Sequence, residues 1–271
     1  MRKILYIVFV VFAMSFTSCE LVDGLLNNEG DGLSTDEVVQ GLKTALEVGT
    51  DTSVTVTSKE DGYYKDEVIK VLLPDDVEEV YELRNNAAIQ ALGISDKINS
   101  VEKSLNRAAE DASTTAKPIF KDAIFGLSIS DGFAILNGSN PAKKNRSAIE
   151  AFDSTAATNY LVSTTRNKLV EAFAPKIDGS LAKKILDIFG TRYSANDLWD
   201  GIKTPFNAYA TSIFNVTSSK PITTNLSQYV TGKALDGLFH KVGVMERKIR
   251  KDPFKWALDI LQKVFGSVMA K

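Results

Sequence analysis

Apolar residues recur three and four positions apart along most of this chain, which is the spacing that places side chains on one face of a helix. The pattern is clearest near the carboxyl end. Between Leu226 and Arg250 the expected inward positions are Val230, Ala234, Leu235, Leu238, Phe239 and Val242. Asp252-Pro253 then resembles a helix start with proline at its first position. The apolar stripe of that last helix is Phe254, Leu258, Leu261, Val264, Phe265 and Val268. The chain is therefore predicted to be all-α.

Capping residues and prolines divide the rest of the pattern into segments of helical length. Ser34-Thr35-Asp36-Glu37 is a capping box and begins a first helix. Pro74 begins a second helix that Gly93 ends, and Ser95 begins a third that Pro118 would break or kink. Further helical segments are predicted over residues 119–127, 130–136 and 180–189 (ended by Gly190), and over 196–214 with an interruption near Pro205. Asn140-Pro141 opens a polar segment, after which apolar residues from Phe152 to Phe173 indicate one broken or two short helices that Pro175 closes.

Residues 53–58 have two possible structures. Their sequence, SVTVTS, alternates like a strand, and Val68–Leu73 could pair with it across Glu60-Asp61-Gly62. A small β-hairpin near residues 53–73 and a first helix that runs to about Ser58 both fit the sequence. No tandem repeat and no second composition regime is present, so residues 34–271 are predicted to form a single, bundle-like domain of many helices.

The first residues resemble the signal peptide of a bacterial lipoprotein. Arg2 and Lys3 precede an apolar run over residues 4–16, which is shorter than the roughly 20 residues that a membrane span needs. The run ends in Thr17-Ser18-Cys19, and small residues before a cysteine resemble a lipobox, with Phe16 at the position where leucine is usual. Residues 1–18 are therefore predicted to be removed, and Cys19 to be lipidated.

Cys19 is the only cysteine, so the chain has no internal disulfide and no cysteine-based metal site. Acylation of Cys19 by palmitate-like chains would supply more than one anchor, and membrane binding would be stable. Residues 20–33 are polar and glycine-rich and would form a flexible tether between the lipid and the fold. We expect a location in the cell envelope, at the outer membrane and facing the periplasm.

Composition excludes several classes of function. The formal net charge is −2, and removal of a leader that carries Arg2 and Lys3 would make it about −4, which disfavours nucleic acid as a partner. His240 is the only histidine, so a histidine-rich zinc site is excluded. The sequence also contains no phosphate loop, no dinucleotide fingerprint and no nucleophile elbow. No catalytic residue, cofactor or metal is expected.

Two groups of polar residues are candidates for a ligand cleft. Arg107 and Glu110 share a face of the Ser95 helix, with Asn106 beside them. The second group recurs at spacings of four, three and four along the Leu226 helix and consists of Tyr229, Lys233, Asp236 and His240. If the two groups faced each other, the cleft could bind an anionic or polar ligand. The alternative, which the pattern favours, is a solvated face or a structural network of ion pairs.

A basic cluster follows on the same helix and consists of Arg247, Lys248, Arg250, Lys251 and Lys255. Beside an anchored domain it could contact anionic headgroups. It could equally be a solvated helix end where cations complement the helix dipole.

Several short sequences together resemble a known family. They are residues 41–46 (GLKTAL), 105–110 (LNRAAE), 116–120 (AKPIF), 191–193 (TRY), 229–239 (YVTGKALDGLF) and 249–253 (IRKDP). In this order and at these spacings the chain resembles domain of unknown function family 4197 over about residues 33–266. The resemblance implies an all-helical bacterial domain and an envelope address, and it favours a first helix that continues past Gly49. It supplies no catalytic residues.

From these observations we expect a non-enzymatic, membrane-anchored lipoprotein that binds an envelope partner or a ligand. A carrier of a small molecule or lipid in a polar cleft between helices is the alternative, and an unrecognised enzyme ranks third. The sequence contains no signal for the oligomeric state.

Overall fold

The computed structural model describes residues 34–75, 94–142, 152–184, 186–188, 190–213, 220–256 and 258–269. Residues 1–33, with the predicted signal peptide, Cys19 and the tether, lie outside the described residues, as do residues 76–93 and the helix predicted there.

The all-α prediction is confirmed. The helices are α2 (Thr35–Thr57), α5 (Ile94–Ser113), α6 (Ala116–Phe125), α7 (Ile129–Leu136), α8 (Ala156–Leu181), α9 (Ala195–Ala210), α10 (Leu226–Lys251) and α11 (Asp259–Met269). A short 3₁₀ turn, η2 (Pro253–Lys255), joins α10 to α11, and β1 (Leu186–Ile188) pairs with β2 (Thr191–Tyr193) in an antiparallel hairpin.

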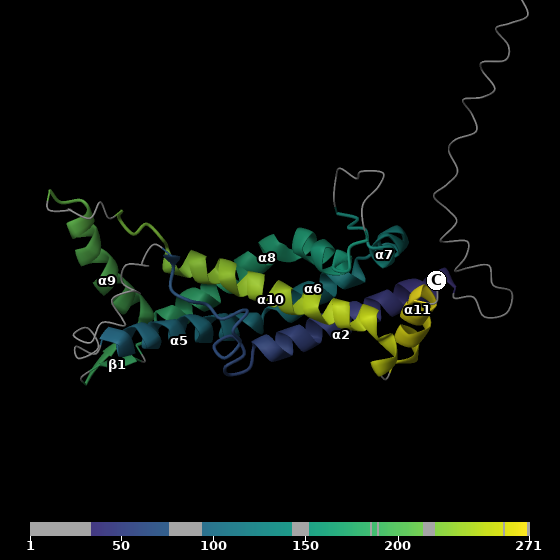
Figure 1. Cartoon of the computed structure of the whole chain (residues 1–271), viewed down its shortest axis with the longest axis horizontal. Coiled ribbons are helices and arrows are strands. Elements are labelled where there is room, and N and C mark those ends of the chain that lie inside the picture. The colour runs from purple at the N-terminus through teal and green to yellow at the C-terminus, as the bar shows by residue number, and fades with distance from the viewer. Residues whose placement is uncertain are drawn as a thin grey trace, which may run out of the picture.

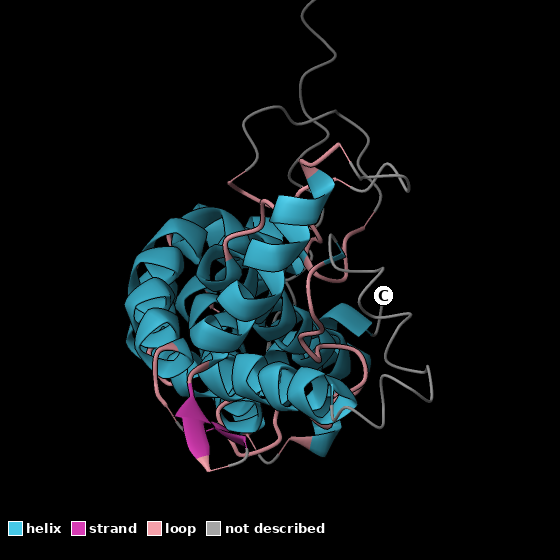
Figure 2. Ribbon diagram, turned by 90° about the vertical axis from the view of Figure 1, so that its left-hand side faces the viewer, coloured by secondary structure: helices cyan, strands magenta, loops and turns pink. Residues whose placement is uncertain are grey.

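The long helices α2, α5, α8 and α10 run along the length of an elongated bundle (Figure 1). α9 and the hairpin lie at one end, and α7 and α11 lie at the other. Viewed from the α9 end, the helices pack around one another and the hairpin sits at the edge (Figure 2). Of the described helices, none has the length and apolar character needed to cross a membrane.

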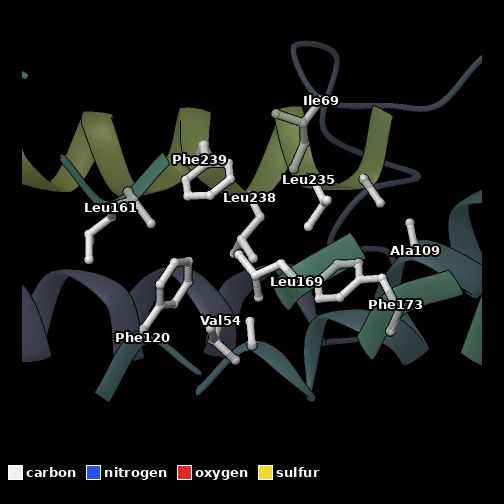
Figure 3. Close-up of a cluster of buried hydrophobic side chains, with 14 of the residues drawn as sticks. Val54, Ile69, Ala109, Phe120, Leu161, Leu169, Phe173, Leu235, Leu238 and Phe239 are labelled. Atoms are coloured by element: carbon white, nitrogen blue, oxygen red, sulfur yellow. The ribbon is translucent and has the colours of Figure 1, made fainter. Parts of the chain in front are cut away.

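Large apolar side chains from α2, α6, α8 and α10 meet in the core of the bundle (Figure 3). Phe120 and Phe239 contact edge to face, with ring centroids 5.8 Å apart. All six inward positions predicted for α10, from Val230 to Val242, are buried. Each fully buried leucine or phenylalanine stabilises the fold by about 1.5–3 kcal/mol, so this shared core holds the long helices together.

The first helix begins as the capping box predicted. The Ser34 hydroxyl accepts from the Glu37 amide at 3.2 Å, and the Glu37 carboxylate accepts from the Ser34 amide at 2.8 Å. The helix continues to Thr57, so residues 53–57 are helical and the alternative of a hairpin near residues 53–73 is wrong. The Ser53 and Thr57 hydroxyls donate to the carbonyls four residues back, at 2.7 and 2.9 Å, which explains how buried polar residues fit a helix.

The small hairpin instead occupies residues 186–193, where a helix over 180–189 was predicted. Gly190 has a φ of +80°, a conformation that glycine adopts without strain. Its amide donates to the Asp187 carboxylate at 2.9 Å. Gly190 therefore closes a tight turn between two strands and does not end a helix.

Two prolines behave differently from each other. Pro118 lies in the first turn of α6, and α5 ends before it at Ser113, as predicted. Pro175 was predicted to close a helix, but α8 continues through it to Leu181. Phe173, Ile177 and Leu181 are fully buried on both sides of Pro175, and their packing offsets the lost hydrogen bond.

The last helix begins later than predicted. Asp252-Pro253 opens the short η2 turn, and α11 starts at Asp259. Leu261, Val264 and Phe265 are buried as expected, whereas Phe254 and Leu258 are exposed.

Candidate functional site

Residues 58–75 follow α2 and form an irregular segment, which we call the strap. It contains turns and a short extended stretch, and Asp61 within it has a φ of +65°. The strap contacts both α5 and α10, and its Ile69 reaches α10 in Figure 3. The candidate residues of α5 all act on this segment.

Asn106 of α5 is fully buried and forms two hydrogen bonds with the backbone of the strap at Val71. Its side-chain oxygen accepts from the Val71 amide at 2.8 Å, and its amide nitrogen donates to the Val71 carbonyl at 2.7 Å. The same nitrogen donates to the Glu102 carbonyl at 2.8 Å. Asn106 thus provides the pair of hydrogen bonds that a neighbouring strand would provide.

Glu110 of α5 holds the strap one turn further along. Its Oε1 accepts from the amides of Tyr63 and Tyr64, at 3.1 and 3.3 Å. Its Oε2 pairs with Arg107, whose guanidinium also pairs with Asp61 at 2.6 Å and with Glu60 at 2.9 Å. The three candidate residues of α5 are therefore brought together, and they bind the chain's own backbone and side chains.

Tyr63 connects the strap to α10. Its side chain is fully buried, and its hydroxyl donates to the Ala234 carbonyl at 2.7 Å and accepts from Ser113. Burial raises the pKa of this hydroxyl above its ordinary value, so it stays protonated and can donate. Gly237 makes the contact possible, because a Cβ there would lie 2.7 Å from the Tyr63 ring.

Glu102 lies beside Asn106 and is also buried. Desolvation raises the pKa of its carboxyl, against the opposing effects of Lys70 and a hydrogen bond from the Leu73 backbone. The Lys70 ammonium is 3.9 Å away and lies 4.5 Å from the centre of the Tyr64 ring. Among the described residues, the Glu102 Oε1 has no hydrogen-bond partner.

The candidate residues of α10 are placed differently. Tyr229 is partly buried, and its hydroxyl donates to the Leu73 carbonyl of the strap at 3.4 Å. Lys233 is exposed, with its ammonium 5.6 Å from the centre of the Tyr229 ring. Asp236 is exposed and pairs with Arg166 of α8 at 2.7 Å, and His240 is exposed. Of this group, Tyr229 alone has a described contact with the strap.

A second buried charge pair joins Glu246 and Arg250. Arg250 was assigned from the sequence to the exposed basic cluster, and this is wrong, because its side chain is only 10% exposed. Glu246 of α10 accepts from the amides of Ala157 and Thr158, at 3.0 and 2.8 Å, and so caps the first turn of α8. Arg250 pairs with Glu246 at 2.8 Å and donates to the Ile135 carbonyl at 2.8 Å, at the end of α7. The Glu246 carboxylate thus lies at the amino terminus of α8, and the Arg250 guanidinium lies at the carboxyl terminus of α7. Each charge is opposite in sign to the helix-dipole end that it contacts, which is favourable.

A small cavity lies next to this pair. Its volume is about 20 Å³, which is room for about one water molecule. The cavity is lined by Leu42, Ala45, Leu46, Gly49, Ala157, Val242, Glu246, Ile249, Arg250 and Phe265. None of the predicted cleft residues lines it. In the part of the chain that the structure describes, no group of three or more His, Cys, Asp or Glu side chains could bind a metal ion.

A comparison with family models supports the family resemblance. The model described as "Protein of unknown function (DUF4197)" covers residues 32–266, which confirms the resemblance seen in the sequence. No curated protein and no solved structure matches the chain.

Proposed function

The chain belongs to the DUF4197 family, and we propose that it is a lipid-anchored envelope protein that binds a protein partner through the outward side of its strap. We also propose that it is not an enzyme, because the polar candidate residues of α5 bind the chain's own strap. The observation that carries the proposal is the two-sided character of the strap. Its inner side is held by buried polar groups, and its outer side presents apolar residues.

The strap has apolar residues on both its inner and its outer side. Ile69, Val71 and Leu73 are buried, whereas Val68 and Leu72 are 69% and 49% exposed. Val68 and Ile69 lie in a turn, and over Val71–Leu73 the exposure alternates as in an extended chain with one face on the core. The outer apolar side chains are therefore presented on a backbone that the protein holds in place.

The backbone at Val68 has its own support. The Asp66 carboxylate accepts from the amides of Val68 and Ile69, at 3.2 and 3.3 Å, and pairs with Lys241 of α10. A loop held by a rigid scaffold is a common place for recognition, and a prearranged loop loses less conformational freedom on binding. These contacts support partner binding at Val68 and Leu72.

The contacts between α5 and the strap also argue against catalysis. Asn106, Arg107 and Glu110 are engaged with the strap, so their hydrogen-bonding groups are directed at the protein itself. The alternative function is a carrier of a small molecule or lipid. It would need space beyond the cavity of about 20 Å³ beside Glu246.

Site-specific photo-crosslinking in intact cells tests the proposal. A photoreactive residue replaces Val68 or Leu72 in the full-length chain, and Val170 of α8, which is 39% exposed, serves as the matched control. We expect one protein adduct at the strap that is absent at Val170 and is weakened by Asn106→Ala. Equal labelling at all three sites, or a bound small molecule or lipid in native mass spectra of the purified protein, would overturn the proposal.

The anchor has a separate test. Replacement of Cys19 with alanine is expected to abolish lipid labelling and to leave an unprocessed precursor. Normal processing of the Cys19→Ala chain would show that the leader is not a lipoprotein signal.

A further inference from the structure

One end of the bundle combines exposed cations with exposed apolar side chains. Arg247, Lys248 and Lys251 are exposed in the last turns of α10, and none of the three has an ion-pair partner among the described residues. Phe254 follows within η2 and is 63% exposed, and Leu258 is 38% exposed. These five residues lie within twelve positions of one another in the sequence.

The cations share the outer side of α10. At 100° per residue, Arg247, Lys248 and Lys251 fall within one third of the helix circumference. Ile249 and the Glu246–Arg250 pair lie on the opposite, buried side. Cations in a last turn complement the helix dipole, which would explain the charges alone. The dipole gives no reason for an exposed phenylalanine beside them.

Phe254 is held in its exposed position by a glycine. A Cβ at Gly266 of α11 would lie 2.9 Å from the Phe254 Cζ, so the ring rests directly on the α11 backbone. The neighbouring Lys255 pairs with Asp252 at 3.1 Å. Phe254 and the three cations of α10 are thus exposed at the same end of the bundle, and we call these four residues the basic end.

The basic end lies where the chain enters the bundle. Gly49 of α2 lies beside Met245 and Ile249, and Gly41 lies beside Ile260 and Val264. Consequently α10 runs antiparallel to α2, and the start of α2 at Ser34 lies at the same end as α11 (Figure 1). Fourteen residues separate Cys19 from Ser34, and a flexible chain of that length spans roughly 20 Å.

We propose that the basic end docks on an anionic lipid surface, with Phe254 entering the interfacial region and Arg247, Lys248 and Lys251 binding phosphate headgroups. The inference rests on the proposed anchor at Cys19, which would keep the basic end within reach of the membrane. Aromatic and basic residues together are typical of surfaces that bind the membrane interface.

Docking would set the position of the strap. The strap contacts α10 at Ala234 and Gly237, and Lys251 lies 14 residues beyond Gly237. At 1.5 Å per residue that distance along the helix is about 20 Å. With the basic end on the lipid surface, Val68 and Leu72 would stand above the headgroups, open to a partner. Acidic Asp259 and Glu37 lie at the same end of the bundle, so the docking surface is confined to the last turns of α10 and to Phe254.

Fluorescence quenching in reconstituted vesicles tests the docking. The lipidated full chain carrying Phe254→Trp is placed in vesicles of brominated phosphatidylcholine, with or without phosphatidylglycerol. Ile213→Trp is the matched control, because Ile213 is 94% exposed and follows α9 at the opposite end. The fluorescence of the new tryptophan is the difference between the variant and the wild-type chain. We expect it to be quenched in the anionic vesicles for Phe254→Trp and to be unaffected for Ile213→Trp.

Charge reversal provides the second arm. Each cation near an anionic surface favours binding by about fivefold. The double variant Lys248→Glu, Lys251→Glu is therefore expected to reduce the ratio of docked to undocked protein by roughly tenfold or more. Flotation of the vesicles at high salt reports the anchor independently. Flotation without selective quenching would overturn the docking alone, whereas failure to float would overturn the anchor.

Discussion

Two glutamates on two helices use the same chemistry for different purposes. Glu110 and Glu246 are both buried, each pairs with an arginine on its own helix, and each accepts hydrogen bonds from two consecutive backbone amides. The amides that Glu246 binds belong to the first turn of α8, a long helix of the core. Those that Glu110 binds belong to the irregular strap.

The difference lies in what each pair connects. Glu246 and Arg250 join α10 to the ends of α8 and α7, and the Arg250 side chain is only 10% exposed. Arg107, the partner of Glu110, is 24% exposed and also contacts Asp61 and Glu60. We therefore expect loss of Glu246 to destabilise the whole bundle, and loss of Glu110 to release mainly the strap.

The largest effect is expected for Glu246→Ala. The substitution leaves Arg250 buried without its acid and removes the cap of α8, which should lower the free energy of unfolding by about 3–5 kcal/mol. Urea denaturation measures the change. Lys117→Ala is the control, because Lys117 pairs with Asp51 on the surface and should matter by less than about 1 kcal/mol. A similar loss in both variants would contradict a special role for Glu246.

A smaller effect is expected for Glu110→Ala. Two strap amides lose their acceptor, at a cost of about 1–3 kcal/mol, but Arg107 keeps Asp61 and Glu60. Limited proteolysis should then cut within residues 58–75 before it cuts elsewhere. If Glu110→Ala instead lost as much stability as Glu246→Ala, with no preferred cleavage in the strap, the contrast between the two sites would be wrong.

Glu102 gives the strap a pH dependence of defined sign. Because desolvation raises the pKa of this carboxyl in the folded protein, the folded chain binds its proton more tightly than the unfolded chain does. The contribution of Glu102 to stability is therefore present below the ordinary glutamate pKa and declines as the pH rises through the raised value. Urea denaturation from about pH 4 to about pH 7 should show wild type losing stability relative to Glu102→Gln. A constant difference between the two proteins would contradict this.

The smallest effect is expected for Asp236→Asn. Asp236 pairs with Arg166 on the surface, with side chains 60% and 39% exposed, so the change in the free energy of unfolding should stay within about 0.5 kcal/mol. A thermal melt suffices to measure it. A substantial drop in the melting temperature would show that the outer side of α10 carries more of the fold than its exposure indicates.

Local signals in the sequence were sufficient for much of the fold. The capping box at Ser34 and the apolar spacing of α10 predicted helices that the structure contains, because both signals depend on residues within a few positions of one another. Residues 53–57 were ambiguous for the same reason. Their hydroxyls bond to carbonyls of their own helix, so a polar and apolar alternation that resembles a strand is compatible with a helix.

The strap shows what the sequence could not supply. Val68–Leu73 was predicted as a possible strand, and exposure does alternate over Val71, Leu72 and Leu73. The expected partner was a strand, but the actual partner is the side chain of Asn106, 35 residues away on a helix. Likewise, Glu246 and Arg250 stand in a basic surface sequence, and their burial depends on the distant ends of α8 and α7. Tertiary contacts of this kind leave no local pattern.

α5 holds the strap in place independently of the Glu246–Arg250 pair, which joins α10 to the ends of α8 and α7. Hydrogen exchange of backbone amides in the Asn106→Ala variant tests this claim most directly. Loss of two buried hydrogen bonds at about 1 kcal/mol each should accelerate exchange at Val71 by roughly tenfold or more, while Ala157 and Thr158 keep their wild-type protection. Unchanged exchange at Val71, or equal acceleration at all three amides, would contradict it.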